Sequence, residues 1–189
     1  MPPPLHFKQA ETEQEFEQIH DLLYRIFVVE IPRYADPGTG FLVDKYHEKN
    51  RYFIALRGER VCGVVAVHGE APFSVAEMLD DPDVLLRLCP RLLEARILAV
   101  EPGERPGVAF AGLTRLVYDD ACRRGFRYLA ITGLAARQEM YRRIGFRPLG
   151  AAKLRGQEHF VPMLLDLEDV PKRVRRYADR RRRAAAGQE

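Results

Sequence analysis

The sequence predicts an α/β (α+β) fold, and two observations lead to this fold class. Strand-like apolar segments alternate with segments of helical spacing between residues 5 and 167. The stretch 92–146 also runs strand, glycine-bearing loop, helix, strand and helix, which is an α/β unit. We therefore expect one domain, residues 1–170, followed by a basic helix or disordered tail, residues 171–189.

The first part of the chain predicts a strand, a long helix and a long loop. Residues 5–8 are a candidate for a short first strand. Thr12 and Glu15 have the spacing of a capping box, in which two side chains satisfy free amides at a helix start. An apolar stripe of helical spacing continues to about Val29. After it, prolines and glycines predict a long loop, or a loop with one helical turn, over residues 31–49. Loops of that length in compact domains are often lids or walls of binding sites.

The middle of the chain predicts a hairpin and a broken helix. Residues 52–56 and 61–68 read as two antiparallel strands, joined by the turn 57–60. Residues 74–88 have helical character that Pro82 interrupts.

The next segment predicts the centre of the sheet. Residues 92–100 are apolar on both faces apart from Glu94 and Arg96, as in a strand buried on both sides. A helix over 108–124 follows, and Gly125 ends it. The loop between them lies at a helix N-terminus, where free amides and the helix dipole favour an anion such as phosphate.

The last part predicts a strand over 127–132 and a helix over 135–144 that ends at Gly145. A shorter strand is expected near 149–154, and the final strand at 159–167.

Composition excludes several classes of protein. At 47% hydrophobic and 30% charged residues, the chain is ordinary for a soluble globular protein. No apolar run approaches the roughly eighteen residues of a membrane span, and the start, MPPPLHFK, has no signal-peptide hydrophobic region. Cys62, Cys89 and Cys122 are expected to be buried free thiols, and no metal-ligand spacing of Cys and His is present. We therefore expect a cytoplasmic protein with no membrane span and no metal.

The charge is distributed unevenly. Residues 171–189 hold eight basic and two acidic side chains, so residues 1–170 carry a net charge of about −3. Nucleic acid is thus an unlikely partner except through the basic tail.

The order of segments over residues 5–167 and the closing MYRRIGF (residues 140–146) resemble the Gcn5-related N-acyltransferases (GNAT). The resemblance implies a GNAT-like domain over residues 1–170, with a central mixed, mostly antiparallel sheet flanked by helices. It also implies that a pantetheine arm pairs with the backbone of strand 92–100 and that a diphosphate rests on the following loop. The donor contacts that it implies are Leu98, Ala99, Val100, Arg105, Gly107, Val108 and Ala109.

The loop fits the family pattern in part. That pattern is Arg or Gln, two residues, Gly, one residue, then Gly or Ala. Gly107 and Ala109 fit, whereas the basic residue, Arg105, is displaced by one position and Glu104 stands in its place. Pro106 also removes an amide that could meet a phosphate. The alternative is a loop that binds no ligand.

A closer resemblance is to autoinducer synthases and long-chain N-acyl amino acid synthases, which take the acyl group from acyl carrier protein. It is carried by residues 24–27 (YRIF), residues 44–47 (DKYH), the strand pair and the strand 93–100. In those families the strand's glutamate and arginine are usually three apart. Glu94 and Arg96 are two apart, which places both on one face of a strand.

Three residues are candidates for acid–base chemistry. Glu94 is the first choice for the proton acceptor, because a carboxylate in an apolar strand holds a proton more tightly unless it is paired. The alternative is a structural Glu94–Arg96 ion pair. His68 is the rival base, with a surface position as its alternative. Tyr141, four residues before Gly145, resembles the family tyrosine that protonates the leaving thiolate; otherwise it is a packed aromatic residue.

Arginines are the candidates for binding the acceptor and a carrier protein. Arg25, Arg33 and Arg96 are expected to hold the acceptor's carboxylate, and His47 lies in the same region. The alternative for Arg25, Arg33 and His47 is solvated surface charge. A further set has the charge to face an acidic carrier protein, or else forms a solvated surface: Arg123, Arg124, Arg142 and Arg143.

The sequence therefore predicts an N-acyltransferase that moves an acyl group from acyl-CoA or an acyl carrier protein to the primary amine of an amino acid or other small molecule. No tightly bound cofactor is expected. The alternatives are a non-catalytic sensor or interaction domain of the same fold, and a module of a larger protein.

Overall fold

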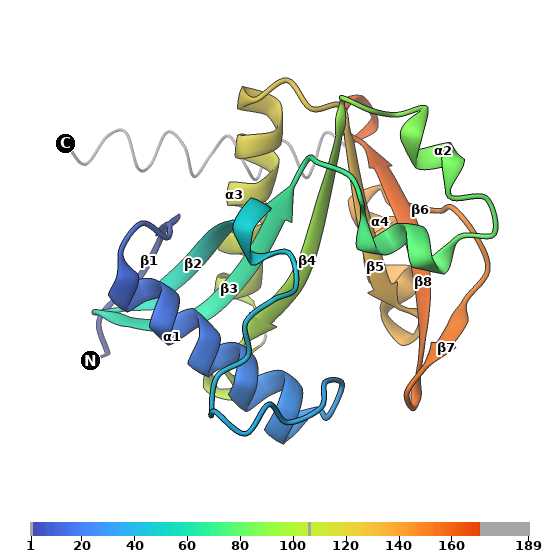
Figure 1. Cartoon of the computed structure of the whole chain (residues 1–189). Coiled ribbons are helices and arrows are strands. Elements are labelled where there is room, and N and C mark those ends of the chain that lie inside the picture. The colour runs from blue at the N-terminus through green and yellow to red at the C-terminus, as the bar shows by residue number, and fades with distance from the viewer. Residues whose placement is uncertain (1, 106, 171–189) are drawn as a thin grey trace. The chain divides into compact units, whose positions relative to one another are not determined.

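The computed structural model describes residues 2–105 and 107–170, which fall into two compact units. Unit 1 contains residues 1–70 and 95–120, and unit 2 contains residues 71–94 and the chain from 121 onward (Figure 1). The predicted tail, residues 171–189, lies outside the described residues. Strand β4 (Leu92–Val100) and helix α3 (Val108–Arg123) contribute residues to both units.

Unit 1 is built on an antiparallel sheet. Strand β1 pairs with β2 and β2 pairs with β3, with an irregularity of register between Ala55 and Leu56. The elements of unit 1 besides β4 and α3 are β1 (Leu5–Gln9), α1 (Glu13–Tyr24), the π-helix η1 (Arg25–Glu30), the 3-10 helices η2 (His47–Lys49) and η4 (Pro102–Glu104), β2 (Arg51–Arg57) and β3 (Arg60–His68). The predicted first strand, hairpin and long loop are confirmed.

Helix α1 begins with the predicted capping box. The Glu15 amide donates to Thr12 Oγ1 at 3.2 Å, and the Thr12 amide donates to Glu15 Oε2 at 3.1 Å. The helix was expected to continue to about Val29, but from Arg25 it changes to a π-helix. Such segments occur frequently at functional sites, because the wider turn redirects the side chains that follow.

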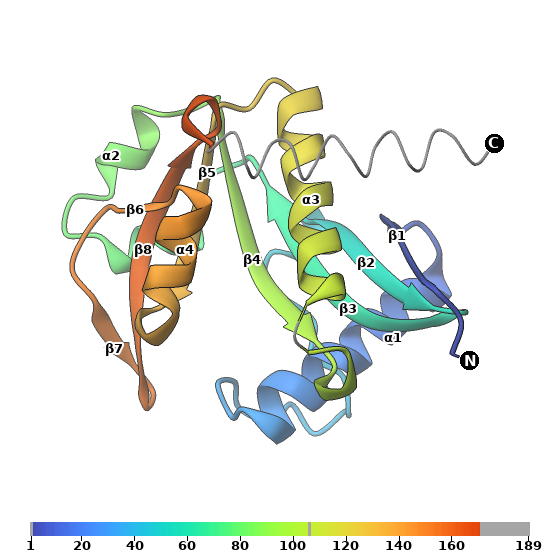
Figure 2. The same cartoon turned by 180° about the vertical axis from the view of Figure 1, so that it is seen from behind.

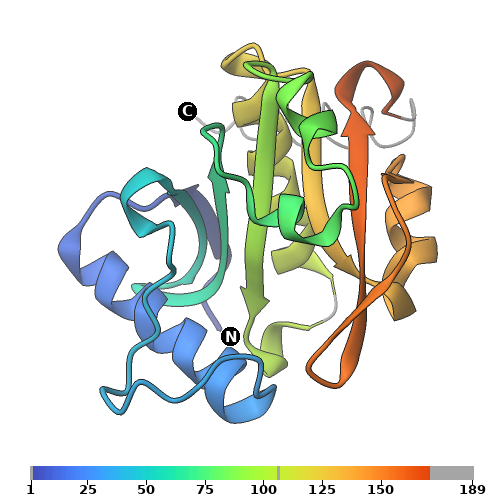
Figure 3. The same ribbon diagram turned by 45° about the vertical axis from the view of Figure 1, so that its right-hand side comes forward.

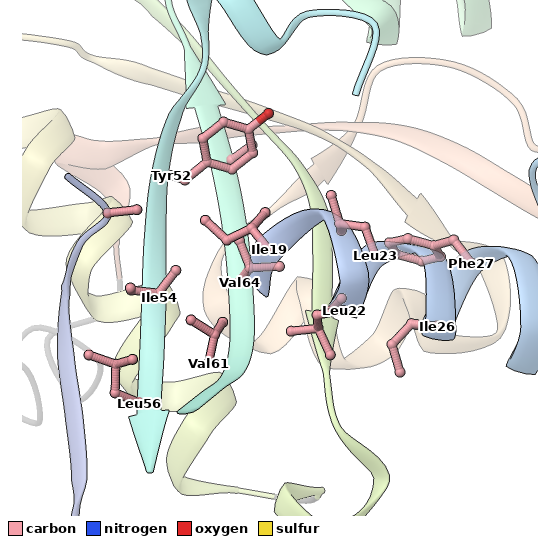
Figure 4. Packing of buried hydrophobic residues seen from close by; sticks show 13 residues of the cluster. Ile19, Leu22, Leu23, Ile26, Phe27, Tyr52, Ile54, Leu56, Val61 and Val64 are labelled. Carbon is pink, nitrogen blue, oxygen red and sulfur yellow. The ribbon is translucent and has the colours of Figure 1, made fainter. Parts of the chain in front are cut away.

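The core of unit 1 lies between α1 and the sheet (Figure 4). The apolar stripe of α1 and η1 is buried as its spacing predicts, and it packs against inward residues of β2 and β3. Each fully buried side chain of this size contributes about 1.5–3 kcal/mol to stability. The helical side of this core is Ile19, Leu22, Leu23, Ile26 and Phe27.

Unit 2 contains the second part of the sheet and several short helices. Strand β5 pairs antiparallel with β8, and β8 pairs with both β6 and β7, the latter as a hairpin (Figure 3). Helix α4 lies beside β5 (Figure 2). The elements are η3 (Ser74–Met78), α2 (Asp83–Leu86), β5 (Tyr128–Leu134), η5 (Ala135–Arg137), α4 (Gln138–Ile144), β6 (Arg147–Pro148), β7 (Lys153–Arg155), β8 (Glu158–Asp166) and η6 (Leu167–Asp169).

The prediction that Pro82 interrupts the helical segment 74–88 is confirmed, because two short helices, η3 and α2, lie on either side of it. The strand expected near 149–154 is instead two short strands, β6 and β7, on either side of a turn. Gly125 and Gly145 adopt φ angles of 77° and 118° and end their helices as predicted.

The described strands form an eight-stranded mixed sheet with the hydrogen-bonding order β1-β2-β3-β4-β5-β8-β6 and with β7 beside β8. The β4–β5 pair is parallel, while the pairs β1–β2, β2–β3, β5–β8, β6–β8 and β7–β8 are antiparallel. The expected α/β class, with helices flanking a mostly antiparallel sheet, is confirmed.

Two smaller expectations concern cysteines and membranes. All three cysteines are free thiols, but only Cys62 is buried, whereas Cys89 is partly buried and Cys122 is exposed. Burial raises the pKa of the Cys62 thiol to about 11. Among the described helices, none has both the length and the apolar character of a membrane span.

Replacing Thr12 by alanine is expected to lower the free energy of unfolding by about 1 kcal/mol, because the Glu15 amide loses its acceptor. Urea unfolding measures the effect. Thr12→Ser keeps the hydroxyl and serves as the control. Equal stability of the two variants would contradict this role of the cap.

Candidate functional site

Strand β4 has a strained backbone at Ile97, where φ is 47°. A β-branched residue rarely adopts this left-handed conformation, which costs about 1–3 kcal/mol and is typical of active sites and ligand clamps. The parallel register of β4 with β5 covers Leu92–Glu94, although the strand continues to Val100. The strained residue therefore lies in the part of β4 beyond that register.

Arg96, immediately before the strained residue, forms a buried ion pair with Asp44. Its Nη1 donates to Asp44 Oδ1, and the exposed fractions of the two side chains are 9% and 2%. The guanidinium also lies over the Tyr46 ring, 4.5 Å from the centroid. The Nε of Arg96 is buried and has no hydrogen-bond partner among the described residues.

Asn50 connects this ion pair to a second group of side chains. Its Nδ2 donates to Asp44 Oδ1 at 2.9 Å and to the Tyr52 hydroxyl at 3.2 Å. A carboxylate can only accept, so this orientation of the amide is the one that Asp44 requires. Asn50 Oδ1 is buried without a partner among the described residues.

Tyr52 connects Asn50 to His47 through its hydroxyl group. The Tyr52 side chain is fully buried in the unit 1 core (Figure 4), and burial raises the pKa of its phenol to about 12. The phenol is therefore protonated at neutral pH. Its oxygen accepts from Asn50 and lies 3.1 Å from Nδ1 of His47, which can accept the phenol proton.

His20 of α1 packs against His47, with ring centroids 5.0 Å apart. Burial, followed by repulsion from His47, lowers the pKa of His20 below its ordinary value. The His20 ring is therefore neutral at pH 7, and its Nε2 is buried without a partner among the described residues. We call this set the Asp44 cluster: His20, Asp44, Tyr46, His47, Asn50, Tyr52 and Arg96.

The Asp44 cluster can bind a small polar molecule. Buried polar atoms in proteins are nearly always hydrogen-bonded, yet three buried atoms of this cluster have no protein partner in the described chain. They belong to Arg96, which donates, Asn50, which accepts, and His20, which can do either. With one carboxylate and one guanidinium, the cluster can match a ligand that carries both charges.

His68, the predicted rival base, lies beside this cluster in unit 1. Its ring centroid is 5.2 Å from that of Tyr46, so His68 and Arg96 contact the same aromatic ring. His68 Nδ1 lies 3.0 Å from the carbonyl oxygen of Glu70, which can only accept. The neutral ring therefore has its proton on Nδ1 and its lone pair on Nε2. The side chain is buried rather than at the surface.

Glu94, the predicted base, lies in unit 2 and is 1% exposed. Its Oε1 accepts from the Val75 amide and the Ser74 hydroxyl, both at 2.7 Å, and its Oε2 accepts from the Ser74 amide at 2.8 Å. These amides lie at the start of η3, where a helix leaves amides unpaired. The carboxylate therefore caps η3, while Arg96 has Asp44 as its partner instead of forming the alternative pair.

Arg25 and Arg33, expected to hold the acceptor's carboxylate, have partners of their own. Arg25 Nε donates to Asp21 at 2.8 Å and its Nη1 donates to Glu101 at 3.0 Å. The guanidinium of Arg33 lies 5.8 Å from the centre of the Phe27 ring. Of the three predicted arginines, Arg96 is the one within the Asp44 cluster.

The loop before α3 has its charged side chains in ion pairs. Arg105 Nε donates to the Val100 carbonyl and Nη1 to Glu30 Oε1, both at 2.6 Å. Arg57 forms an ion pair with Glu104 at 2.6 Å, and this hydrogen bond lowers the pKa of Glu104. The side chain of Arg105, the predicted phosphate ligand, is thus already bonded to Val100 and Glu30 within unit 1.

Helix α3 starts where the sequence predicts. Gly107 has a φ of 130°, and its carbonyl accepts from the Ala111 amide at 3.0 Å. Val108 is exposed and Ala109 is buried. On β4, Leu98 is partly buried, while Ala99 and Val100 are buried, so the strand's contribution to a ligand would come from its backbone.

Tyr141 lies on α4 and packs against β5 within unit 2. A Cβ added at Gly133 would lie 2.6 Å from Cε2 of the Tyr141 ring, so the absence of a side chain there admits the ring. The ring also lies against Phe146, with centroids 6.3 Å apart. Tyr141, four residues before Gly145 on α4, therefore packs its ring directly against Gly133 of β5.

Sequence reasoning missed three residues of the Asp44 cluster. It identified Arg96, His47 and the segment of Asp44 and Tyr46, but not His20, Asn50 or Tyr52. The available signal was His20, a polar residue next to the apolar stripe of α1, and the polar segment 47–50 directly before β2. Only the pairing of α1 with the loop 31–49, for example the Leu42 amide donating to His20, brings them together.

Comparison with known proteins places this geometry in a family. The family model described as FeeM, N-acyl amino acid synthase, matches residues 18–166. The structure resembles that of FeeM, an N-acyl amino acid synthase from uncultured soil microbes, with a TM-score of 0.71 and 18% identity over 88% of this chain and 93% of that chain. No curated protein sequence gives a significant match.

Two further solved structures share the fold. The CoA-dependent acyl-homoserine lactone synthase BjaI matches with a TM-score of 0.73 and 20% identity, over 94% of this chain and 89% of that chain. The AHL synthase LasI matches with a TM-score of 0.67 and 16% identity, over 87% of this chain and 89% of that chain.

Glu94→Gln is expected to lower the free energy of unfolding by about 1–3 kcal/mol, because an amide NH₂ would face donors at Ser74 and Val75. Urea unfolding measures the change, with the exposed Glu139→Gln as the control. A stability equal to that of the control would show that the cap at η3 does not depend on the carboxylate.

Proposed function

The chain belongs to the FeeM family of N-acyl amino acid synthases, and from that premise we propose that it transfers an acyl group from a thioester to the amine of an amino acid. In this reaction the amine nitrogen attacks the thioester carbonyl. The N–C bond forms, the C–S bond breaks, a base takes the amine proton and the departing thiolate receives a proton. The protein therefore has to hold two substrates and move protons.

The backbone of β4 is the observation that carries the proposal. Its register with β5 covers Leu92–Glu94, while the strand continues through the strained Ile97 to Val100. An extended ligand can pair with the backbone of such a strand as a further strand would. We assign residues 95–100 to the pantetheine arm of the donor. The diphosphate of a CoA donor would then meet the amides at Gly107 and the start of α3.

The Asp44 cluster is the proposed site of the acceptor. An amino acid carries a carboxylate and an amino group on one carbon, and the Arg96–Asp44 pair presents one charge of each sign. The free Nε–H of Arg96 is a donor for the carboxylate. Arg25 and Arg33 are secondary candidates for this contact, because Arg25 is already paired with Asp21 and Glu101.

His68 is supported as the base over Glu94. The hydrogen bond of His68 Nδ1 to Glu70 leaves the ring's lone pair on Nε2, the form that accepts a proton. Glu94 already accepts three hydrogen bonds at η3. Glu94 remains a candidate that acts through water. Tyr141 is the proposed acid that protonates the thiolate.

The donor is an acyl-CoA or an acyl carrier protein. The structural similarity to BjaI, a CoA-dependent synthase, supports CoA, and Gly107 and Ala109 fit the family's diphosphate loop. The ion pairs that occupy Arg105 and Glu104 leave fewer charges for a diphosphate and favour a carrier protein. In that case Arg123, Arg124, Arg142 and Arg143 are the proposed contacts with the acidic partner.

Purified protein incubated with acyl-CoAs or acyl carrier proteins and a panel of amino acids is expected to form N-acyl amino acids, detected by mass spectrometry with release of free thiol. Tyr141→Phe is expected to lower kcat about a hundredfold, since it removes the proton donor. A donor with an acidic thiophenol leaving group, which needs no proton, is expected to restore most of that loss. His68→Gln is expected to lower kcat with both donors.

Surface variant His159→Gln is the control and is expected to match the wild type, because this side chain is exposed on β8. Donor binding in calorimetry without any N-acyl product across the panel would contradict the proposal and indicate a non-catalytic sensor. Equal kcat values of Tyr141→Phe and wild type would contradict the assigned acid alone.

A further inference from the structure

A chain of hydrogen bonds in unit 1 connects the Asp44–Arg96 pair to two histidines of the same cluster, to which the proposed mechanism assigns no proton transfer. It runs from Asp44 to Asn50, on to Tyr52, and ends at His47, against which His20 packs. Tyr52 is 1% exposed and Asp44 is 6% exposed, so water cannot readily replace these bonds.

The direction of each bond follows from chemistry. Asp44 accepts from Asn50, so the Asn50 amide also donates its other N–H to the Tyr52 oxygen. The Tyr52 phenol keeps its proton at neutral pH, and that proton has His47 Nδ1 as its acceptor, 3.1 Å away. His47 is thereby held as the neutral ring with its own proton on Nε2.

Protonation of His47 is incompatible with a hydrogen bond in which the Tyr52 phenol donates to His47 Nδ1. A doubly protonated His47 ring has no lone pair on Nδ1, so Nδ1–H and the phenol O–H would both present protons across one bond. The Tyr52 hydroxyl would have to rotate, which breaks its contact with Asn50 or leaves a buried donor unsatisfied. Asn50 is the residue that, with Arg96, fixes the Asp44 carboxylate.

The surroundings of the pair allow such a proton only at a cost. His20 comes from α1, His47 and Glu48 from η2, and Tyr52 from β2. Asp44 and Glu48 raise the pKa of the neighbouring Tyr52 phenol and Arg96 lowers it, while burial and His47 lower the pKa of His20. Phe16 lies against both the His47 and Tyr52 rings and adds no charge.

We propose that His20, His47, Asn50 and Tyr52 are positioning residues that keep the Asp44–Arg96 pair in its acceptor-binding geometry only while both histidines are neutral. The inference rests on the proposed function in that it takes the pair as the acceptor site. Its consequence is a pH dependence of acceptor affinity that does not come from the reacting groups. Because the pKa of His20 is lowered from the ordinary histidine value of about 6.5, acceptor affinity is expected to fall as the pH falls below that value.

The test compares the KM for the acceptor at pH 7.5 and pH 5.5 in the wild type and in the double variant His20→Phe, His47→Gln. Glutamine offers an oxygen to the Tyr52 proton and does not titrate, and phenylalanine keeps the ring contact. Any pH-independent effect of the two substitutions on acceptor binding is present at both pH values, so the ratio of the two KM values at one pH is compared with the ratio at the other. From pH 7.5 to pH 5.5 the wild-type KM is expected to rise about tenfold more than the KM of the variant, as for the loss of one buried hydrogen bond.

Protonation of the free acceptor amine affects both proteins equally and cancels in the ratio. His6→Gln, an exposed histidine on β1, is the matched control and is expected to follow the wild type. If the ratio of the variant's acceptor KM to that of the wild type is the same at both pH values, the inference is overturned. A change in kcat with an unchanged KM also overturns it.

Nitrogen NMR of the histidine rings gives a second readout that needs no activity. At pH 8 the His47 proton is expected on Nε2, and this signal is expected to change together with that of Tyr52 as the pH is lowered. A proton on Nδ1 at pH 8 would overturn the inference. If no thioester and amine pair is turned over, the proposed function fails, while the NMR result still decides the hydrogen-bond chain.

Discussion

The parallel pairing between β4 and β5 ends at Glu94. The proposed mechanism depends on this end point, because the donor arm is assigned to the backbone of β4 beyond it. Beyond it the strand carries Arg96, the strained Ile97 and the backbone assigned to the donor arm. Two sets of contacts flank this point. Glu94 holds the start of η3, and Arg96 holds Asp44. Glu94 and Arg96, two residues apart on one strand, thus have unrelated partners. Their spacing in the sequence could not show this.

Much of the fold could be predicted from the sequence because local signals were strong. The capping box, the apolar stripe of α1, the bounds of β4 and the glycine stops at Gly125 and Gly145 each have a local physical cause. The errors came where local signals compete. The π-helix at Arg25 continues a helical pattern with a different hydrogen bond, and β6 and β7 are too short to show a periodicity.

The site was less predictable because its side chains meet through tertiary contacts. Arg96 and His68 were identified from their strands, but their common contact with Tyr46 requires the loop 31–49 to fold back on the sheet. Glu94 was interpreted from burial alone. The three hydrogen bonds from Ser74 and Val75 instead give Glu94 a structural role, because a carboxylate that caps a helix is held in place before any substrate binds. Asn50 and His20 are partly buried polar residues, and only their contacts with Asp44, Tyr52 and His47 explain their positions.

Hydrogen–deuterium exchange of the wild-type protein with a non-hydrolysable acyl-pantetheine thioether tests the central claim most directly. The account predicts slower exchange of the amides of residues 95–100 when the ligand is bound, with the amides of β1 unchanged. Saturating ligand that slows exchange elsewhere and leaves residues 95–100 unaffected would contradict it.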